Sequence, residues 1–390
     1  MDAETDPLDR RRYIATTAAL EELCAELAGS PWLAVDTEFF REKTYYPQLC
    51  LLQVASRTTL ACIDPLAIES LRPLLPILQD GACVKIFHAA RQDLEIFYHL
   101  FGTLPAPVFD TQVAAPLLGH PTQASFTTLV TDLLGAELPK DCSRTDWRKR
   151  PLTSAQLRYA AADAYYLGLM YERLRDELAA RGRLAWLADD MHALSEPDLY
   201  RNEPELAWQR IRAWQRLRPL QLAGLQALAA WREATAQSLN TPRSWLVRDE
   251  TLVDMARARP ADTAALARVR DLPSRMIDEY GEQLLTALRD AAAATPPSTP
   301  RTSRAQTAKP NEEALVDALM AFVRLRGMDL EINPAIIASR SDVLGLIQHG
   351  EGSLLQGWKR TVIGEDLLRL LGGELSLQIR RGRLYAAPVK

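Results

Sequence analysis

The stretch "LAVDTEFFREKTYYPQLCLLQ", residues 33–53, places two carboxylates at the end of an apolar run suited to a buried β-strand. In an extended strand, residues two apart project to the same face. Asp36 and Glu38 therefore point one way, while Val35 and Phe39 point the other. A carboxylate that leaves water is costly unless it is paired or binds a metal. The pair predicts a metal site or a solvated strand end, and by itself it does not decide between them.

The first 200 residues alternate strand-like and helical runs around this stretch. Strands followed by helices that pack on both faces are typical of a mixed α/β sheet in one domain. The fold class that we predict is a mixed sheet flanked by helices, followed by all-helical domains. The expected strands are 32–39, 48–56, 58–64, 83–89 and 107–111, and the expected helices are 17–29, 71–80, 91–102, 111–119 and 153–180.

Composition and charge narrow the class of protein. The 390 residues are 47% hydrophobic and 25% charged, with a formal net charge of −4, so nucleic-acid affinity would require a local basic face. We expect no signal peptide and no membrane span, because no window approaches eighteen unbroken apolar residues. The five cysteines are scattered without a CxxC pair, which favours a reducing, cytoplasmic location and disfavours a cysteine-ligated zinc site.

From about residue 200 the apolar residues recur only at helical spacing. We expect an α/β domain at 1–200, a helical domain at 203–290, a flexible linker rich in Ala, Pro, Ser and Thr at 291–310, and a second helical domain with a C-terminal tail at 311–390. The two helical segments share a pattern in which Trp245 corresponds to Ile336, 91 residues later. This indicates a repeated module, and the tail "LSLQIRRGRLYAAPVK" is typical of a β-hairpin.

Two further segments carry acids that can join the first pair. Asp93 lies just inside the helix expected at 91–102, where an acid also complements the helix dipole. Tyr159 and Asp163 are four apart, so on a helix they share one face. Asp36, Glu38, Asp93 and Asp163 can converge in one cleft, where their repulsion calls for cations. Oxygen ligands with few nearby histidines suit Mg²⁺ or Mn²⁺, and two such ions about 4 Å apart can promote phosphodiester hydrolysis.

The motifs "VDTEF", "HAARQDLEIF" and "YAAAD" resemble the three exonuclease motifs of the DEDD superfamily, and Tyr-x-x-x-Asp marks its tyrosine branch. The surrounding text, such as "LPKDCSRTDWRKRPLTSAQLRYAAAD", is similar to the ribonuclease D family over roughly residues 10–180. The resemblance implies a ribonuclease H-like fold and metal-dependent 3′-5′ hydrolysis of RNA to nucleoside 5′-monophosphates. The catalytic positions that it implies are Asp36, Glu38, Asp93, Tyr159 and Asp163, with two Mg²⁺ or Mn²⁺ ions held by the four acids.

The helical half is similar to the helicase-and-RNase-D C-terminal (HRDC) module at 203–290 and, with more departures, near 311–373. The family resemblance implies action on RNA with a free 3′-OH, such as tRNA precursors and other small structured RNAs. We expect a monomer. Two alternatives stay open at this point. One is a general or DNA-directed 3′-5′ exonuclease, and the other is a non-catalytic RNA-binding scaffold.

Basic and aromatic side chains suggest where RNA would lie. The segment "SRTDWRKRPLT" precedes the Tyr159 helix and combines cations that can bind phosphates with an aromatic that can stack on a base. The alternative to RNA binding is that this segment is a solvated loop anchored by its tryptophan. We interpret His88 as a strand-end residue rather than a catalytic base. The predicted substrate-binding residues are Phe39, Tyr45, Arg144, Trp147, Arg148, Lys149 and Arg150.

Residues 205–217 are predicted to form a helix, and the segment "WQRIRAWQRLRPLQ", residues 208–221, has two interpretations that the sequence supports equally. Its arginines can guide RNA across the first HRDC module. Alternatively, the tryptophans lie in the core and the arginines in water. The residues concerned are Trp208, Arg210, Arg212, Trp214, Arg216 and Arg218.

Overall fold

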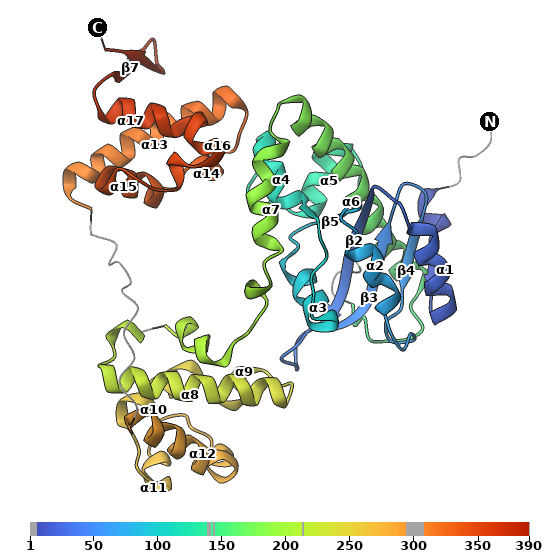
Figure 1. Ribbon diagram of the computed structural model, residues 1–390, viewed down its shortest axis with the longest axis vertical. Coiled ribbons are helices and arrows are strands. Elements are labelled where there is room, and N and C mark those ends of the chain that lie inside the picture. Colours follow the sequence, from blue (N-terminus) through green and yellow to red (C-terminus); the bar gives the residue numbers. More distant parts are fainter. Residues whose placement is uncertain (1–5, 139–141, 143–144, 213, 294–307, 390) are drawn as a thin grey trace.

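The computed structural model describes residues 6–138, 142, 145–212, 214–293 and 308–389. An α/β domain is followed by two helical modules, one below it and one to its left in Figure 1. Most of the linker predicted at 291–310 and the predicted phosphate ligand Arg144 lie outside the described residues. Within the described part of the chain, each helix is too short or too polar to cross a bilayer.

A six-stranded sheet forms the centre of the α/β domain, with the strand order β1-β4-β3-β2-β5-β6. β2 is antiparallel to β3, with Asp36 opposite Gln53, and parallel to β5, with Ala34 opposite Ile86. The mixed sheet predicted from the sequence is therefore confirmed. Its strands are β1 (Arg12–Ile14), β2 (Trp32–Phe40), β3 (Gln48–Ala55), β4 (Leu60–Ile63), β5 (Val84–Phe87) and β6 (Val108–Asp110).

Helices cover both faces of this sheet, so the domain has two apolar cores. The core under α1, α2 and α3 includes Leu20, Leu74 and Phe97. The core under α5 and α6 includes Leu129 and Leu167. Each core excludes water from one face of the central strands. The helices of this domain are α1 (Thr17–Leu27), α2 (Leu75–Leu78), α3 (Arg91–Phe101), α4 (Thr111–Ala114), α5 (Phe126–Leu134), α6 (Ser154–Ala180) and α7 (Ala188–Leu194).

The long helix α6 approaches the sheet closely because small residues line its inner face. Its first turn is fixed by a capping box in which Thr153 and Gln156 each bond the other's backbone N–H. The alanines 160–162 are fully buried. At Gly168, an added Cβ would lie 2.6 Å from the ring of Trp32. The distance between α6 and β2 is therefore set by this glycine and these alanines.

We predict that Gly168→Ala destabilises the α/β domain by about 1–3 kcal/mol, because the new methyl group must displace the Trp32 ring in a packed core. Gly345→Ala is a matched control: it also lies within a helix, α15 (Arg340–His349), but its added Cβ would meet nothing within 4 Å. That change should be neutral or stabilising, since alanine favours helix over glycine. Calorimetric unfolding of both variants tests this, and equal effects would contradict the role assigned to Gly168.

The C-terminal half contains two modules with the same order of helices. The first comprises α8 (Pro219–Ser238), α9 (Arg243–Leu246), α10 (Asp249–Ala258), α11 (Thr263–Leu266) and α12 (Ser274–Ala293). The second comprises α13 (Pro310–Leu330), α14 (Pro334–Ile337), α15, α16 (Gly357–Lys359) and α17 (Glu365–Leu371). α13, α14 and α15 each begin 91 residues after α8, α9 and α10, as the repeat in the sequence indicated.

Two local expectations have different outcomes. The C-terminal hairpin is confirmed: β7 (Leu375–Arg380) pairs antiparallel with β8 (Arg383–Pro388). The regular helix expected at residues 205–217 is wrong, because the chain there forms the 3₁₀ segments 204–210 and 214–216. Trp208 and Trp214 are both buried there with their rings 4.9 Å apart, so the tryptophans serve the core of the first module.

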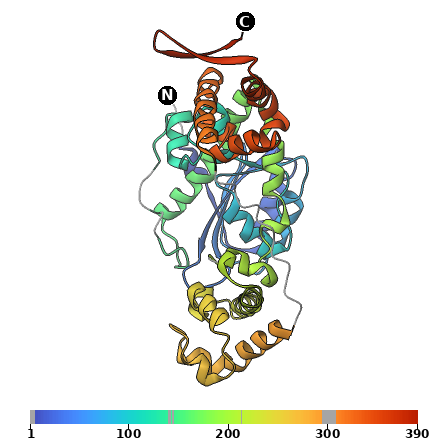
Figure 2. The same ribbon diagram turned by 90° about the vertical axis from the view of Figure 1, so that its left-hand side faces the viewer.

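Each helical module packs against the α/β domain at a different place. The loop between β2 and β3 contacts the first module, where the backbone N–H groups of Tyr45 and Tyr46 donate to the Asn240 side chain. The second module contacts the opposite end, where Trp186 and Trp358 stack with parallel rings 4.9 Å apart. Figure 2, turned by 90°, also shows the α/β domain between the two modules.

Candidate active site

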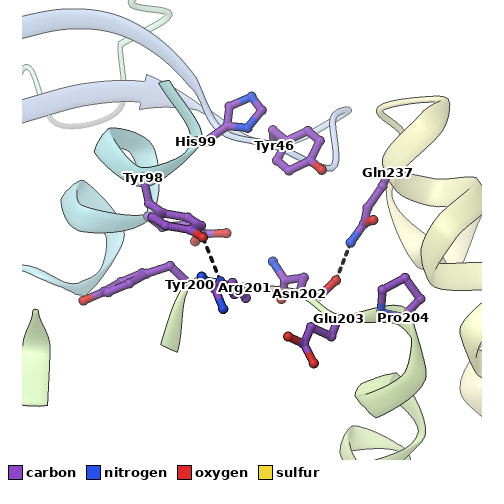
Figure 3. Close-up of a pocket in the computed structure, with 10 residues that line it drawn as sticks. Tyr46, Tyr98, His99, Tyr200, Arg201, Asn202, Glu203, Pro204 and Gln237 are labelled. Atoms are coloured by element: carbon purple, nitrogen blue, oxygen red, sulfur yellow. Dashed lines mark hydrogen bonds between the residues drawn. The ribbon is translucent and has the colours of Figure 1, made fainter. Parts of the chain in front are cut away.

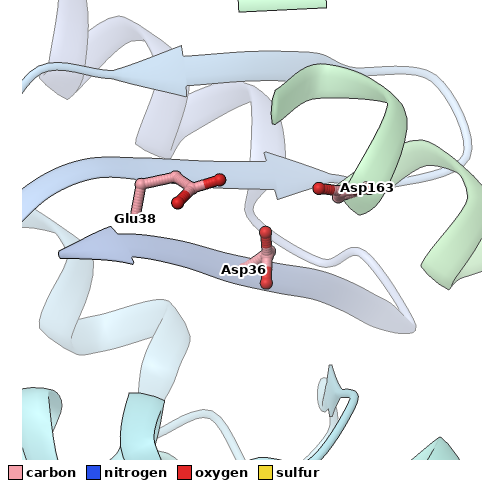
Figure 4. Close-up of side chains that lie close together, drawn as sticks. All are labelled: Asp36, Glu38 and Asp163. Atoms are coloured by element: carbon pink, nitrogen blue, oxygen red, sulfur yellow. The ribbon is translucent and has the colours of Figure 1, made fainter. Parts of the chain in front are cut away.

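Three carboxylates from two elements meet at the centre of the α/β domain. β2 supplies Asp36 and Glu38, and α6 supplies Asp163, and one oxygen of each lies within 4.8 Å of the others. The side chains converge on the gap between β2 and the helix in Figure 4. All three are half-buried. The alternation of side chains along β2 therefore places its two acids toward α6, as the strand pattern predicted.

Asp93 lies outside this group of three. It is buried in the first turn of α3, where the Thr37 hydroxyl donates a hydrogen bond to its carboxylate. Thr37 lies between the two acids of β2 and points to the opposite face. Burial and the charge of Asp36 both raise the pKa of Asp93 well above its usual value. Asp93 is thus electrostatically coupled to the cluster, although its carboxylate does not join the group in this conformation.

Tyr159 stands one helical turn before Asp163 on α6. Its hydroxyl interacts with the Asp163 carboxylate. Its ring stacks on the buried Trp147 with centroids 6.3 Å apart and an interplanar angle of 28°. Burial, followed by the charges of Asp163, Glu38 and Asp36, raises the pKa of the Tyr159 phenol. The phenol therefore stays protonated at neutral pH and acts as a hydrogen-bond donor.

Burial dominates the electrostatics of the three clustered acids. It raises the pKa of Asp36 to about 7. For Glu38, burial and then the charges of Asp36, Asp163 and Asp93 raise the pKa to about 9. Burial and the charge of Asp36 raise the pKa of Asp163 well above its ordinary value. Half-buried carboxylates this close together are stable either as protonated groups or when they share a cation.

The donor set of the cluster fits a hard divalent cation. Three carboxylate oxygens make up the group, and oxygen ligands with flexible spacing suit Mg²⁺ or Mn²⁺ better than zinc. A cation would also stabilise the ionised carboxylates, whose pKa values are raised by burial and, at Glu38 and Asp163, by neighbouring charges. Asp36, Glu38 and Asp163 are therefore a candidate site for divalent metal.

A cavity of about 160 Å³ opens beside the cluster and brings in residues that the sequence did not single out. Asp36, Asp163 and Tyr159 line it together with His88 and with Phe126 and Thr127 of α5. Phe126 contacts the His88 imidazole edge-to-face at 5.6 Å. No local motif marks Phe126 or Thr127, because only the packing of α5 against α6 brings them here.

His88 occupies the strand end predicted for it, after β5. Its Nδ1 lies 2.9 Å from the Thr111 hydroxyl, and it shares the cavity with Asp36. Burial lowers the pKa of its imidazole, with the charge of Asp110 acting in the opposite direction. His88 is therefore neutral at physiological pH and lines the site without carrying a positive charge.

The predicted base-stacking role of Trp147 is wrong for this structure. Trp147 is only 4% exposed and belongs to the core under α6, so its ring supports Tyr159 and is closed to a base. Arg150 is also engaged internally. It forms a two-pronged ion pair with Asp64 and donates to the Cys50 carbonyl oxygen, so it anchors the loop rather than offering a phosphate contact.

Two cations of the same loop remain at the surface. Arg148 is exposed, pairs with Asp146 at 2.9 Å and lies 3.6 Å above the Phe40 ring. Lys149 is also exposed. Phe39 is half-buried and packs on the core under α3, on the face away from the cluster. Substrate contact by Arg148, Lys149 and Phe39 stays a prediction.

The predicted substrate-binding role of Tyr45 is also wrong for this structure, because Tyr45 contacts the first helical module. It is 4% exposed, its hydroxyl donates to Glu233, and Arg243 donates to that hydroxyl at 2.8 Å. Its ring is therefore unavailable for stacking on a base. Beside this contact, a cavity of about 350 Å³ lies between α3 and α8, with Tyr46 stacked on His99 at one side (Figure 3).

Comparison with known proteins places this site in a family. The 3'-5' exonuclease family matches residues 11–179, and the HRDC domain family matches residues 221–288. Ribonuclease D of Granulibacter bethesdensis is 40% identical over 373 residues, covering 94% of each chain. Ribonuclease D of Gluconacetobacter diazotrophicus is 40% identical over 379 residues, covering 96% of each chain.

The chain belongs to the ribonuclease D family. The crystal structure of Escherichia coli RNase D, described as an exoribonuclease involved in structured RNA processing, has a TM-score of 0.79 and 33% identity. The alignment covers 93% of this chain and 98% of that one. The family resemblance, the fold class and the enzyme class, a 3′-5′ exoribonuclease, are thereby confirmed, which weighs against the scaffold alternative.

The raised pKa values predict how the stability of this ribonuclease D family member depends on pH. In the folded state the pKa of Asp36 is about 7 and that of Glu38 is about 9, against about 4 for an ordinary carboxylate. Between about pH 4 and pH 9 the folded state therefore binds more protons than the unfolded state. Without metal, the melting temperature should therefore fall as the pH rises from 5 to 9. Mn²⁺ should raise it more at pH 8.5 than at pH 6, because the ion competes with protons.

Thermal unfolding in EDTA and in Mn²⁺ measures both effects. Asp36→Asn should flatten the pH dependence, since it removes one titrating acid and its repulsion of Glu38. Glu69→Gln, at an exposed site, is the matched control and should leave the slope unchanged. A metal-free melting temperature that rises over this range would contradict the assignment.

Proposed function

We propose that this enzyme hydrolyses the 3′-terminal phosphodiester of RNA, using two divalent ions held by Asp36, Glu38, Asp93 and Asp163. The observation that carries the proposal is the group of three carboxylates within 4.8 Å of one another, beside a small cavity and the Tyr159 phenol. Water adds across the terminal P–O3′ bond. The products are a nucleoside 5′-monophosphate and a shortened RNA with a new 3′-OH.

The acids have distinct roles in this proposal. Asp36 is central, since its charge acts on Glu38, Asp93 and Asp163 alike. Asp93 would join the other three when its carboxylate turns from Thr37 toward Asp36. Bound divalent ions lower the pKa of a water nucleophile and stabilise charge on the leaving oxygen.

Tyr159 positions the nucleophile in this proposal. Because its pKa is raised, the phenol keeps its proton and serves as an oriented hydrogen-bonding group rather than a base. Trp147 fixes the ring from behind and Asp163 fixes the hydroxyl. His88, Phe126 and Thr127 also line the cavity, where the terminal nucleotide would lie.

The substrates that we propose are tRNA precursors and other structured RNAs with a free 3′-OH. The similarity to E. coli RNase D, an exoribonuclease involved in structured RNA processing, supports this class. The enzyme would act as a monomer in the cytoplasm, and its buried Cys50, Cys62 and Cys83, none of them in a disulfide, are consistent with a reducing compartment.

The domain organisation is also part of the proposal. An exonuclease domain at 1–200 would be followed by an HRDC domain at 203–290 and a second, divergent HRDC-like domain at 311–390, joined by a linker at 291–310. The constant offset of 91 residues between α8–α10 and α13–α15 supports the second domain. Both domains would guide RNA toward the acidic cluster.

A degradation time course on 5′-labelled RNA and DNA of the same sequence tests the activity. Each would carry a free or a blocked 3′ end, in Mg²⁺, Mn²⁺ or EDTA. We expect a metal-dependent ladder only for RNA with a free end, and its loss in Asp36→Ala, because the remaining acids cannot hold the ions alone. Equal shortening of DNA would instead indicate a general 3′-5′ exonuclease.

Tyr159→Phe should lower kcat about 100-fold, with little change in metal affinity, because only the water-orienting hydroxyl is lost. Tyr165→Phe is the matched control: it lies on the same helix, where its ring contacts Tyr166 edge-to-face at 5.3 Å. Single-turnover kinetics and Mn²⁺ titration measure the two quantities. A Tyr159→Phe enzyme with the kcat of the control would exclude the positioning role.

A further inference from the structure

The C-terminal hairpin and the second helical module enclose a cavity that the proposed catalytic function does not use. α13, α17 and the strands β7 and β8 surround a volume of about 970 Å³. This is about six times the volume of the cavity beside the acidic cluster. Figures 1 and 2 both place the hairpin at the end of the molecule remote from the first helical module.

The charge of this cavity is positive although the whole chain carries a net charge of −4. Four arginines and two aspartates line it. Arg326 and Arg369 share the carboxylate of Asp366. In contrast, neither the Arg324 nor the Arg383 side chain forms an ion pair or hydrogen bond with another residue that the structure describes. Two cations are therefore available to an anion from outside.

The hairpin presents its basic and aromatic residues together. Arg383 and Tyr385 are two apart on β8, so they project to one face. Their cross-strand partners on β7 are Arg380 and Gln378. Tyr385 is 45% exposed, and Met328 across the cavity on α13 is 76% exposed. Arginines beside an exposed aromatic ring form a surface that can hold a phosphate backbone and stack a base.

We propose that this basic cavity, formed by α13, α17 and the β7–β8 hairpin, binds the body of the RNA whose 3′ end is hydrolysed. The inference rests on the proposed function, since that function supplies a polyanionic substrate too large for the 160 Å³ cavity. Arg324 and Arg383 bind phosphates, and Tyr385 packs on a base or ribose. A second phosphate-binding surface favours RNAs long enough to span from the hairpin to the acidic cluster.

Charge complementarity selects RNA over a second copy of the chain as the occupant. A copy of this protein would bring Arg380, Arg381 and Arg383 of its own hairpin toward the same positive face. Two unpartnered cations oppose such an association, whereas release of counterions from RNA drives binding to them. The solution mass of the protein distinguishes these occupants.

The test uses the full-length protein and its variants Arg324→Glu, Arg383→Glu and the double change. Arg72→Glu is the matched control, since Arg72 is also exposed but lies on the α/β domain. The probes are a labelled stem-loop RNA with a single-stranded 3′ extension and a short unstructured RNA. Binding is measured in EDTA at several salt concentrations, and hydrolysis is measured in Mn²⁺.

Each single reversal should weaken stem-loop binding about threefold to tenfold and reduce the salt dependence by about one released ion. Arg72→Glu should bind as wild type, and all variants should hydrolyse the short RNA at the wild-type rate. Wild-type affinity in the double variant would overturn the inference. So would an equal loss on the short RNA, or a wild-type dimer that the double variant dissociates.

These results separate the inference from the proposed function. If the wild type shortens neither RNA in Mn²⁺, the proposed exonuclease activity fails. The binding measurements in EDTA still test the hairpin surface in that case, because they require no hydrolysis.

Discussion

Three carboxylates held within 4.8 Å of one another repel, and the α/β domain is built to hold them there. β2 cannot shift because β3 and β5 bond to it on both sides. α6 lies close to the sheet because its small residues, alanines 160–162 and Gly168, allow it to pack directly on the strands. Burial, and then the charges of the neighbouring acids, raises the pKa of Glu38, and a divalent cation would stabilise the ionised carboxylates. Affinity for metal is thus a consequence of how closely one helix packs on one strand.

The same strand links the acidic cluster to the first helical module. After Phe40, the chain turns outward and Tyr45 hydrogen-bonds to both members of the Glu233–Arg243 ion pair, in which Glu233 is buried and Arg243 is half-buried. Removing one partner of such a network leaves a buried polar group unsatisfied, at a cost of several kcal/mol. The orientation of the first module is therefore fixed by a loop that begins three residues after Glu38.

The two helical modules share an order of helices but use the same position differently. Trp245 of the first module is 59% exposed. Its counterpart Ile336 packs against the core of the α/β domain, next to Asn333, whose side-chain amide donates to the His120 carbonyl oxygen. The repeat thus provides one module with an open aromatic surface and another docked beside the exonuclease domain. The periodicity of apolar residues in the sequence does not predict this difference between the modules, because it depends on which part of the protein each module contacts.

The sequence by itself determined the mixed sheet, the shared face of Asp36 and Glu38, the Tyr159–Asp163 pair on one helix face and the 91-residue repeat, because each depends on residues close in the chain. Only the tertiary structure decided that Asp93 turns to Thr37, that Trp147 and Tyr45 are buried, and that Phe126 and Thr127 face the cluster. An aromatic ring in a polar segment has the same local pattern whether it meets RNA or a protein core. Its role depends on contacts between residues far apart in sequence, which packing alone establishes.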